Sequence, residues 1–435
     1  MITLYIVICS LFGYGIIRMI NRTKKFKLGN FSIREKFFFS ITIGSGIISV
    51  LMFILKIINI SVNKVLFIPI ITIAIISLLT LCTEVFKNLK KIKMKKININ
   101  LYNVSGVVLF MILISIYVYY ITIIVTTGDN KTINSFDGTN FYTLLKDGFS
   151  IFVSGHFTYS TNVFAVLFLI LTVTSTVEIA SKHNIKSYFV YLIYILLLFT
   201  YPGIDNMVLM GIKDICIMCF YSAAILYSVE YFIFEKSGEN LLFSSLCIFM
   251  TMLCDPSNLS LLINLLVSVL VCYIVSKKLS RKTFLLDAVK IIMPGIICLV
   301  IWYLSSLFRL IPDKSSSNLA FYFSQLIVEL DAIIRYIYKT GIWPTLVAIA
   351  ILSIVFAVKN IEYSKKVYVW LIYIVAIINL FCTFILLTSH LNIGESIPQL
   401  FMLNMLKIVP IFIIAMLLPF FNSEVKDDAC KEHVT

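Results

Sequence analysis

The feature that most constrains the fold of this chain is a series of apolar segments, each about 15–25 residues long, separated by short polar gaps. Helices of that length cross the roughly 30 Å hydrocarbon layer of a bilayer. The segments are apolar on every face and lack the alternation that marks a strand of an outer-membrane barrel. Only 13% of the residues are charged, whereas a soluble domain carries about a quarter. The sequence therefore predicts an all-α, polytopic membrane protein.

The apolar segments predict about 11–13 transmembrane helices. They are Ile2–Ile17, Phe37–Lys56, Val65–Val85, Val104–Thr126, Asn162–Ile179, Ser187–Thr200, Ile215–Phe234, Leu241–Leu253, Leu259–Ser276, Phe284–Phe308, Trp343–Val358, Val367–Thr388 and Leu400–Phe421. Leu241–Leu253 and Leu259–Ser276 are short and are separated by Asp255 and Pro256. These two segments therefore form either two crossings or one hairpin that does not fully cross.

Basic residues predict the orientation of the chain. They gather in Arg18–Lys36, Lys87–Lys96, Lys277–Lys282 and Lys359–Lys366, which fall at every second gap, as cytoplasmic loops do under the positive-inside rule. This pattern places the N-terminus outside and the C-terminal tail in the cytoplasm. The net charge of +14 then serves orientation and contact with anionic membrane lipid, and nucleic-acid binding is not expected. No charge precedes Arg18, so the first segment lacks the basic region of a cleaved signal peptide and is expected to remain as a span.

Four outer segments follow from this alternation, and they are residues 127–161, 201–214, 309–344 and 389–399. Chemistry at a membrane surface needs polar groups near the interface, so we expect function to reside in these segments. Apolar residues in Ser315–Lys339 recur at the spacing of an amphipathic helix. Such a helix lies along the membrane surface more readily than across it.

The expected organisation has four parts. They are an N-terminal three-helix membrane region (1–100), a core with an outer loop at 127–161 (101–310), an outer amphipathic segment (311–344), and C-terminal membrane helices with a short cytoplasmic tail (345–435).

Asp137 is the residue of the outer segments that most suggests chemistry. A short amphipathic stretch follows it, with Phe141, Leu144 and Leu145 on one face, and Gly148 stands where a helix commonly ends. A carboxylate at the start of a surface helix can deprotonate a hydroxyl group or orient a sugar phosphate through a cation. Asp137 can equally serve as the N-cap of that helix, and the two roles are compatible.

Other polar residues near the outer ends of the spans have both a functional and a structural interpretation. His156 is either a base or ligand, or an interfacial residue. Lys213 is either a phosphate contact or a lysine that extends from a helix end to the interface. Asp255 is either a turn residue before Pro256 or an inward-facing polar group.

Three further patterns favour structural roles. Cys216 and Cys219 lie one turn apart on an apolar helix, and no second pair at ligand spacing accompanies them, which favours packing over redox or metal chemistry. Asp287 and Lys290 are expected to pair with each other. Arg335 is expected either to contact a pyrophosphate-like group or to pair with a carboxylate one turn earlier. No Walker, Rossmann or serine-hydrolase motif is present.

Three stretches between residues 31 and 227 resemble the GT-C glycosyltransferases, multi-span membrane enzymes that use polyprenyl-phosphate sugars. The first is Asp137-Gly-Thr-Asn-Phe-Tyr-Thr-Leu-Leu-Lys-Asp-Gly148, which is similar to the first outer loop of the family. The second is Lys213-Asp214 at the opening of the span IKDICIMCFYSAAILY, similar to the second outer loop of many bacterial members. The third is FSIREKFFFSITIGSGIISVLMFIL, a basic loop that runs into a span, as in bacterial relatives with extra helices before the catalytic loop.

The resemblance implies a GT-C-like fold in a bacterial cytoplasmic membrane. It implies that Asp137 is catalytic and that Asp214 lies near it. Lys213 and Arg335 would then be the counter-charges for the donor phosphate.

The outer loop also departs from the family pattern. Family members often carry paired acidic residues there, whereas the nearest upstream partner of Asp137 is Asp129. The sequence GHFTYST, which contains His156, replaces an aromatic and proline signature. Asp129 and His156 are therefore expected to be accessory residues. The cofactor is left unassigned, with a divalent cation as the candidate.

The expected function is transfer of a sugar from a polyprenyl-phosphate donor to a lipid-linked or cell-surface glycan acceptor on the outer side. Two alternatives stay open. A flippase or transporter for a lipid-linked glycan is expected to carry charges at mid-membrane. A surface-polysaccharide polymerase is expected to have a large Arg-rich outer loop, whereas residues 309–344 contain only Arg309 and Arg335.

Overall fold

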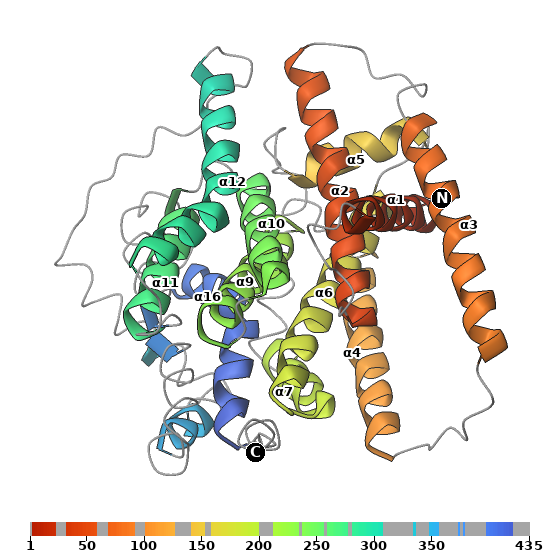
Figure 1. The fold of residues 1–435 in the computed structure, drawn as a ribbon. Helices are drawn as coiled ribbons and strands as arrows, with labels where there is room; N and C mark the ends of the chain where they lie inside the picture. Colours follow the sequence, from red (N-terminus) through yellow and green to blue (C-terminus); the bar gives the residue numbers. More distant parts are fainter. Residues whose placement is uncertain are drawn as a thin grey trace, which may run out of the picture.

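The computed structural model is built from helices (Figure 1). It describes residues 2–22, 32–58, 68–91, 101–126, 141–152, 158–199, 212–234, 237–255, 259–276, 281–307, 334–335, 348–355, 373–374, 377–378 and 397–420. Within these ranges the ordered elements are α-helices, one π-helical turn and one 3-10 turn, without a strand. The predicted all-α fold class is confirmed.

Five helices of the described ranges are long and apolar enough to cross a membrane. Their apolar stretches are Thr3–Ile20, Ile33–Lys56, Val163–Lys182, Lys213–Ile233 and Thr283–Leu304, and shorter apolar helices accompany them. By helix length and hydropathy the chain is a multi-pass membrane protein, as predicted. The total of about 11–13 crossings, the domain boundaries and the side that each end faces stay predictions.

The N-terminal region contains α1 (Ile2–Arg22), α2 (Ile33–Ile57) and α3 (Ile68–Lys91). The Ser32 hydroxyl precedes α2 and accepts a hydrogen bond from the Glu35 amide at 3.1 Å, while the Glu35 carboxylate accepts one from the Ser32 amide at 3.2 Å. This capping box satisfies two amides for which the helix itself offers no acceptor. The local sequence therefore determines where α2 begins.

α1 packs closely against α2 because both carry glycine where they meet. A Cβ atom at Gly13 would overlap the Ser40 carbonyl oxygen, and a Cβ atom at Gly44 would overlap the Cys9 carbonyl oxygen. Small residues allow the backbones of membrane helices to approach in this way. The glycines of the first two spans are therefore a packing device.

A short helix, α5 (Phe141–Phe152), runs crosswise to α2 (Figure 1). Phe141, Leu144 and Leu145 are buried, which confirms the predicted apolar face. The helix packs this face against its neighbours, since the Phe141 ring lies 5.8 Å from the Phe220 ring of the central helix, centroid to centroid.

α5 does not end at Gly148, as the sequence led us to expect, but continues to Phe152. A Cβ atom at Gly148 would lie 2.8 Å from the Tyr5 hydroxyl and 3.1 Å from the Ile48 side chain. The Tyr5 hydroxyl in turn donates a hydrogen bond to the Leu145 carbonyl oxygen at 3.2 Å. Gly148 therefore allows α5 to approach α1 and α2, and it does not terminate the helix.

α9 (Ile212–Val229) lies at the centre of the described helices. Its apolar stretch Lys213–Ile233 is buried except at its two ends, where Lys213, Asp214 and Ile233 are partly exposed. α6 (Thr158–Lys182), α10 (Gly238–Cys254) and α16 (Ile397–Leu417) pack against it. A substitution of a polar residue in α9 is therefore expected to alter the packing of several helices.

The π-helical turn Glu230–Phe234 extends α9. Such turns are rare and occur frequently at functional sites. The Tyr231 hydroxyl donates a hydrogen bond to Asp287 of α12 (Arg281–Leu307) at 2.8 Å, and the Lys290 ammonium lies 3.2 Å from the same carboxylate. The predicted pairing of Asp287 with Lys290 is confirmed.

Three further helices are α4 (Leu101–Thr126), α7 (Ser187–Phe199) and α11 (Leu259–Ser276). α4 packs against α7, and α11 packs against α9 and α12. Asp255 caps the C-terminus of α10, so α10 and α11 are separate helices. The break predicted between these two segments is present.

Candidate functional site

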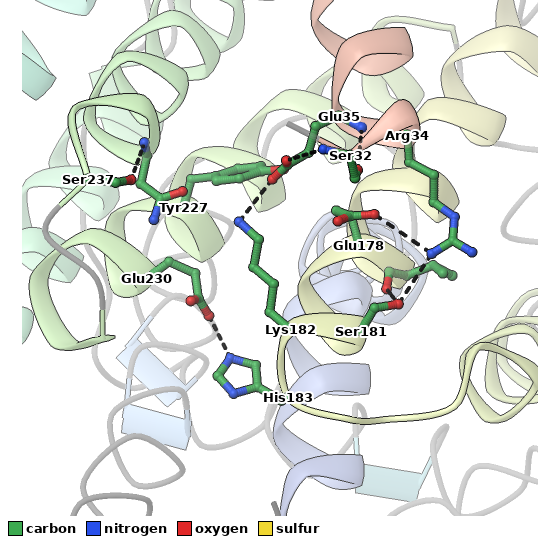
Figure 2. Close-up of polar contacts among 12 residues, drawn as sticks. Ser32, Arg34, Glu35, Glu178, Ser181, Lys182, His183, Tyr227, Glu230 and Ser237 are labelled. Atoms are coloured by element: carbon green, nitrogen blue, oxygen red, sulfur yellow. Dashed lines mark hydrogen bonds and ion pairs between the residues drawn. The ribbon is translucent and has the colours of Figure 1, made fainter. Parts of the chain in front are cut away.

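Polar side chains gather at two ends of the helix bundle. We call the end at which α9 begins the Lys213 end, and the end at which its π-helical turn lies the Glu35 end. α10 runs antiparallel to α9, because Asp255 after its last turn contacts Lys213, whereas Ser244 near its start contacts Ser228 near the end of α9. α2 begins and α6 ends at the Glu35 end (Figure 2).

Two of the predicted site residues, Lys213 and Asp214, lie in the first turn of α9. Arg335 is exposed, and its part in phosphate binding stays a prediction. Asp137, Asp129 and His156 lie outside the described residues. The structure therefore describes the α9 half of the predicted site.

Lys213 forms an ion pair with Asp255, in which Nζ and Oδ2 are 2.9 Å apart. The exposed fraction is 35% for the lysine side chain and 11% for the aspartate side chain. The pair joins the start of α9 to the end of α10. Lys213 therefore does not extend alone to the interface, and Asp255 is an inward-facing ion-pair partner as well as a helix cap.

Asp214 forms a second ion pair with Lys407 of α16, in which Oδ1 and Nζ are 2.9 Å apart. Lys407 lies in an otherwise uncharged helix, shortly before Pro410. A charged side chain inside a membrane span is costly unless it is paired, so Asp214 explains why a lysine is tolerated there. The sequence interpretation gave Lys407 no role. The lone lysine inside the predicted span Leu400–Phe421 was the available signal.

The Lys213 end thus carries two carboxylates and two ammonium groups from three elements of the bundle. Ammonium groups can neutralise a phosphate, and a carboxylate can accept a hydroxyl proton or orient a cation. Each of the two lysines is bound to a carboxylate, so an incoming phosphate would compete with that carboxylate. Within the described ranges, no group of three or more His, Cys, Asp or Glu side chains is placed to hold a metal ion.

A denser group of polar residues, the Glu35 network, lies at the opposite end (Figure 2). Its members are Ser32, Arg34, Glu35, Glu178, Ser181, Lys182, His183, Tyr227 and Glu230. They come from the start of α2, the end of α6 with the residue that follows it, the end of α9 and the π-helical turn that extends α9. The three carboxylates are all buried, so their contacts replace the water that each would otherwise bind.

Glu35 is the centre of the network. Its Oε1 atom lies 2.9 Å from the Lys182 ammonium and accepts a hydrogen bond from the Tyr227 hydroxyl at 3.4 Å. The Lys182 ammonium also lies 5.3 Å from the centre of the Tyr227 ring, which is within the range of a cation–π interaction. One carboxylate therefore connects α2, α6 and α9.

His183 makes the contact to the π-helical turn, since its Nε2 atom lies 2.6 Å from Glu230 Oε1. The chain reverses directly after His183. Asn184 has a φ of 59°, a left-handed conformation that asparagine adopts more readily than most residues, and the Ile185 amide donates to the Ala180 carbonyl oxygen at 3.0 Å. This turn ends α6 and places the imidazole against the end of α9.

Sequence reasoning missed the Glu35 network. Glu178 and Glu230 lie inside the predicted spans Asn162–Ile179 and Ile215–Phe234, where a carboxylate needs a partner. Their location within predicted spans therefore indicated that each carboxylate has a partner. The partners could not be named, because Glu35 and Lys182 are separated by most of the N-terminal half of the described chain.

The cysteines of α9 are accompanied by two cysteines of the neighbouring helix α10. Cys247 and Cys254 lie on α10, which packs against α9. All four are buried and free, and none belongs to a candidate metal group among the described residues. The packing role favoured by the sequence is therefore retained.

Comparison of the sequence with known family models, with curated proteins and with solved structures finds no match.

Proposed function

We propose that this chain is a membrane glycosyltransferase of the GT-C type, which moves a sugar from a polyprenyl-phosphate donor to a lipid-linked or cell-surface glycan acceptor. The observation that supports this proposal is the Asp214–Lys407 ion pair at the Lys213 end. Lys407 provides a positive charge for the leaving phosphate of such a transfer, and Asp214 holds the ammonium group in place. The Lys213–Asp255 pair supplies a second cation at the same end.

The proposed reaction is a displacement at the anomeric carbon of the donor. The acceptor hydroxyl loses its proton to a carboxylate, its oxygen bonds to the anomeric carbon, and the bond from that carbon to the phosphate oxygen breaks. The polyprenyl phosphate leaves with the bonding electrons, and a lysine neutralises its charge. Holding donor and acceptor in this geometry supplies much of the rate increase.

Within this proposal, the ion pairs at the Lys213 end suggest a role for each charged residue. Asp137, predicted from the sequence, is the base. Asp214 orients Lys407 for the leaving phosphate, and Lys213 and Arg335 supply further positive charge. The proposal places the Lys213 end outside and the Glu35 end in the cytoplasm, following the distribution of basic residues.

Radiolabelled transfer by membranes that contain the chain is the direct test, with a panel of polyprenyl-phosphate sugars. We expect one donor to label a lipid-linked or surface glycan, and Asp137→Asn to reduce the rate by about 10²-fold or more, the scale of general-base loss. Asparagine caps a helix about as well as aspartate, so the level of folded protein should not change. Absence of transfer with every donor, by well-folded protein, would contradict the proposal.

The orientation is tested by cysteine substitution and labelling of intact cells with an impermeant reagent. Cysteines at Asn130, Ser316 and Ser396 should be labelled, whereas cysteines at Lys93 and Ser280 should be labelled only after the cells are opened. The parent chain, with its native cysteines, gives the background. The reverse pattern would place the Lys213 end in the cytoplasm and remove the proposed outer chemistry.

Transport of a lipid-linked glycan is a second candidate, for which the observation is the His183–Glu230 contact, although the Glu35 network lies at one end of the bundle and not at mid-membrane. Buried ionisable residues in membrane spans commonly mark substrate or proton pathways, and the His183–Glu230 contact lies beside a π-helical turn. Movement of a labelled lipid-linked glycan across proteoliposomes, measured without a sugar donor, separates the two candidates. Movement that is lost in Glu230→Gln, without sugar transfer, supports transport.

A further inference from the structure

Arg34 lies at the rim of the Glu35 network, and 47% of its side chain is exposed. Its Nη1 atom donates a hydrogen bond to the Ser181 hydroxyl at 3.2 Å and lies 3.7 Å from the Glu178 carboxylate. The Glu178 side chain is only 11% exposed. A nearly buried carboxylate and a neighbouring hydroxyl therefore fix one side of the guanidinium group (Figure 2).

Both contacts engage the same nitrogen of Arg34. The opposite edge of the guanidinium group, formed by Nε and Nη2, makes no hydrogen bond within the part of the chain that the structure describes. Guanidinium groups bind phosphate oxygens through two parallel N–H groups, and a fixed guanidinium loses little freedom on binding. Among the described residues, Arg34 is thus oriented on one edge and open on the other.

The surroundings of Arg34 are basic and partly aromatic. Lys36 and Lys186 are exposed, and Tyr191 of α7 is partly exposed and in electrostatic contact with Arg34. In the sequence, a basic run at residues 22–27 precedes α2. Tyrosine is enriched where helices enter the headgroup region, and basic residues beside a span attract anionic lipid.

We propose that the Nε–Nη2 edge of Arg34 binds the phosphate of an anionic phospholipid headgroup at the Glu35 end. Glu178 and Ser181 orient the guanidinium group, while Lys36 and Lys186 contribute attraction. An anionic headgroup is favoured over a zwitterionic one, because a zwitterionic headgroup brings its own cation to a basic rim. This inference is independent of the proposed sugar transfer, because it concerns the opposite end of α9.

Lipid retention by the purified chain tests the proposal. The full chain, delipidated in a neutral detergent, is given phosphatidylglycerol or phosphatidylcholine, and bound lipid is measured by native mass spectrometry. Arg34→Gln should reduce retention of phosphatidylglycerol by about fivefold, the ratio that corresponds to about 1 kcal/mol per basic residue near an anionic surface. Retention of phosphatidylcholine should be low and unchanged.

Lys56→Gln is the matched control, because Lys56 is 50% exposed and its ammonium lies 3.5 Å from the Asp147 carboxylate, away from the Glu35 end. It should retain phosphatidylglycerol like the parent. Ser181→Ala, which removes the hydrogen bond from Nη1 but keeps the charge of Arg34 and its contact with Glu178, should give an intermediate loss. Equal retention by the parent and Arg34→Gln overturns the proposal, and so does displacement of the lipid by an excess of inorganic phosphate, which would identify a free-anion site.

Discussion

The two ends of α9 hold their charges in different ways. At the Lys213 end, two separate ion pairs each join α9 to one neighbour, and Lys213 and Asp214 are 35% and 29% exposed. At the Glu35 end, the carboxylates of Glu35 and Glu230 are 6% and 4% exposed and belong to a network that joins three helices. The carboxylates are therefore more deeply buried at the Glu35 end than at the Lys213 end, whereas Lys182 and Lys213 are similarly exposed, at 31% and 35%.

This difference indicates which ion pairs stabilise the fold and which can open to bind a ligand. Removal of one partner of a buried pair leaves an uncompensated charge and is strongly destabilising. A half-exposed partner is rehydrated when its pair breaks, so the cost is small and the pair can open for a ligand. We therefore expect substitutions at the Glu35 end to change stability first and those at the Lys213 end to change activity first.

The largest effect on stability is expected for Lys182→Met. The substitution leaves Glu35 buried without its ammonium partner, and breaking a buried pair in this way costs about 3–5 kcal/mol. The free energy of unfolding in mixed detergent micelles measures the loss. Addition of Glu35→Gln should recover most of it, because the double variant has no unpaired charge. A loss below about 1 kcal/mol, the scale of an exposed pair, would show that the two ends do not differ.

Asp214→Asn is expected to separate activity from stability at the Lys213 end. Asparagine can still accept a hydrogen bond from Lys407 but no longer carries the charge, so the unfolding free energy should fall by about 1–3 kcal/mol. Transfer should fall further, by about 10²-fold, because Lys407 is no longer oriented by a carboxylate.

The double variant Asp214→Asn with Lys407→Gln gives the control for this prediction. It removes both charges, so stability should return towards the parent while transfer stays low. Recovery of transfer together with stability would mean that the Asp214–Lys407 pair is structural only.

The sequence predicted those features of the fold that depend on neighbouring residues. Hydropathy located the helices, the spacing of Phe141, Leu144 and Leu145 identified the buried face of α5, and the short separation of Asp287 and Lys290 identified their pair. Each of these follows from helix geometry within a few turns. The packing of α5 past Gly148 could not be predicted, because it depends on Tyr5 and Ile48 in other helices.

The partners of the site residues could not be predicted for the same reason. Asp214 was located at the start of a span, but Lys407 lies near the other end of the chain. The Arg34–Ser181 contact likewise joins residues on different helices. A sequence indicates that a charge in a span needs a partner, whereas only the packing of the helices selects which one.

A moderate effect is expected for Ser32→Ala at the Glu35 end. The alanine removes the side-chain acceptor for the Glu35 amide, and loss of such a helix cap costs about 1 kcal/mol. Ser32→Asp should keep the cap, since aspartate caps about as well as serine. The free energy of unfolding of both variants measures the contribution of the cap. An equal loss of stability in the two variants would indicate that repulsion between the new aspartate and Glu35 costs as much as the cap contributes. The stability of the Glu35 network would then depend on added charge as well as on its ion pairs.

The smallest effect on stability is expected for Lys56→Gln, because this substitution removes the most exposed ion pair of the comparison. Lys56 and Asp147 link α2 to α5, but their side chains are 50% and 44% exposed and the charged atoms are 3.5 Å apart. Water solvates both groups whether or not they meet, so the pair should contribute at most about 1 kcal/mol. The unfolding free energy of Lys56→Gln should therefore match the parent closely, and any difference should shrink at high salt, because exposed charges are screened. A loss as large as that of Lys182→Met, and insensitive to salt, would mean that the position of α5 depends on this pair, and that exposure alone does not decide which charges are structural.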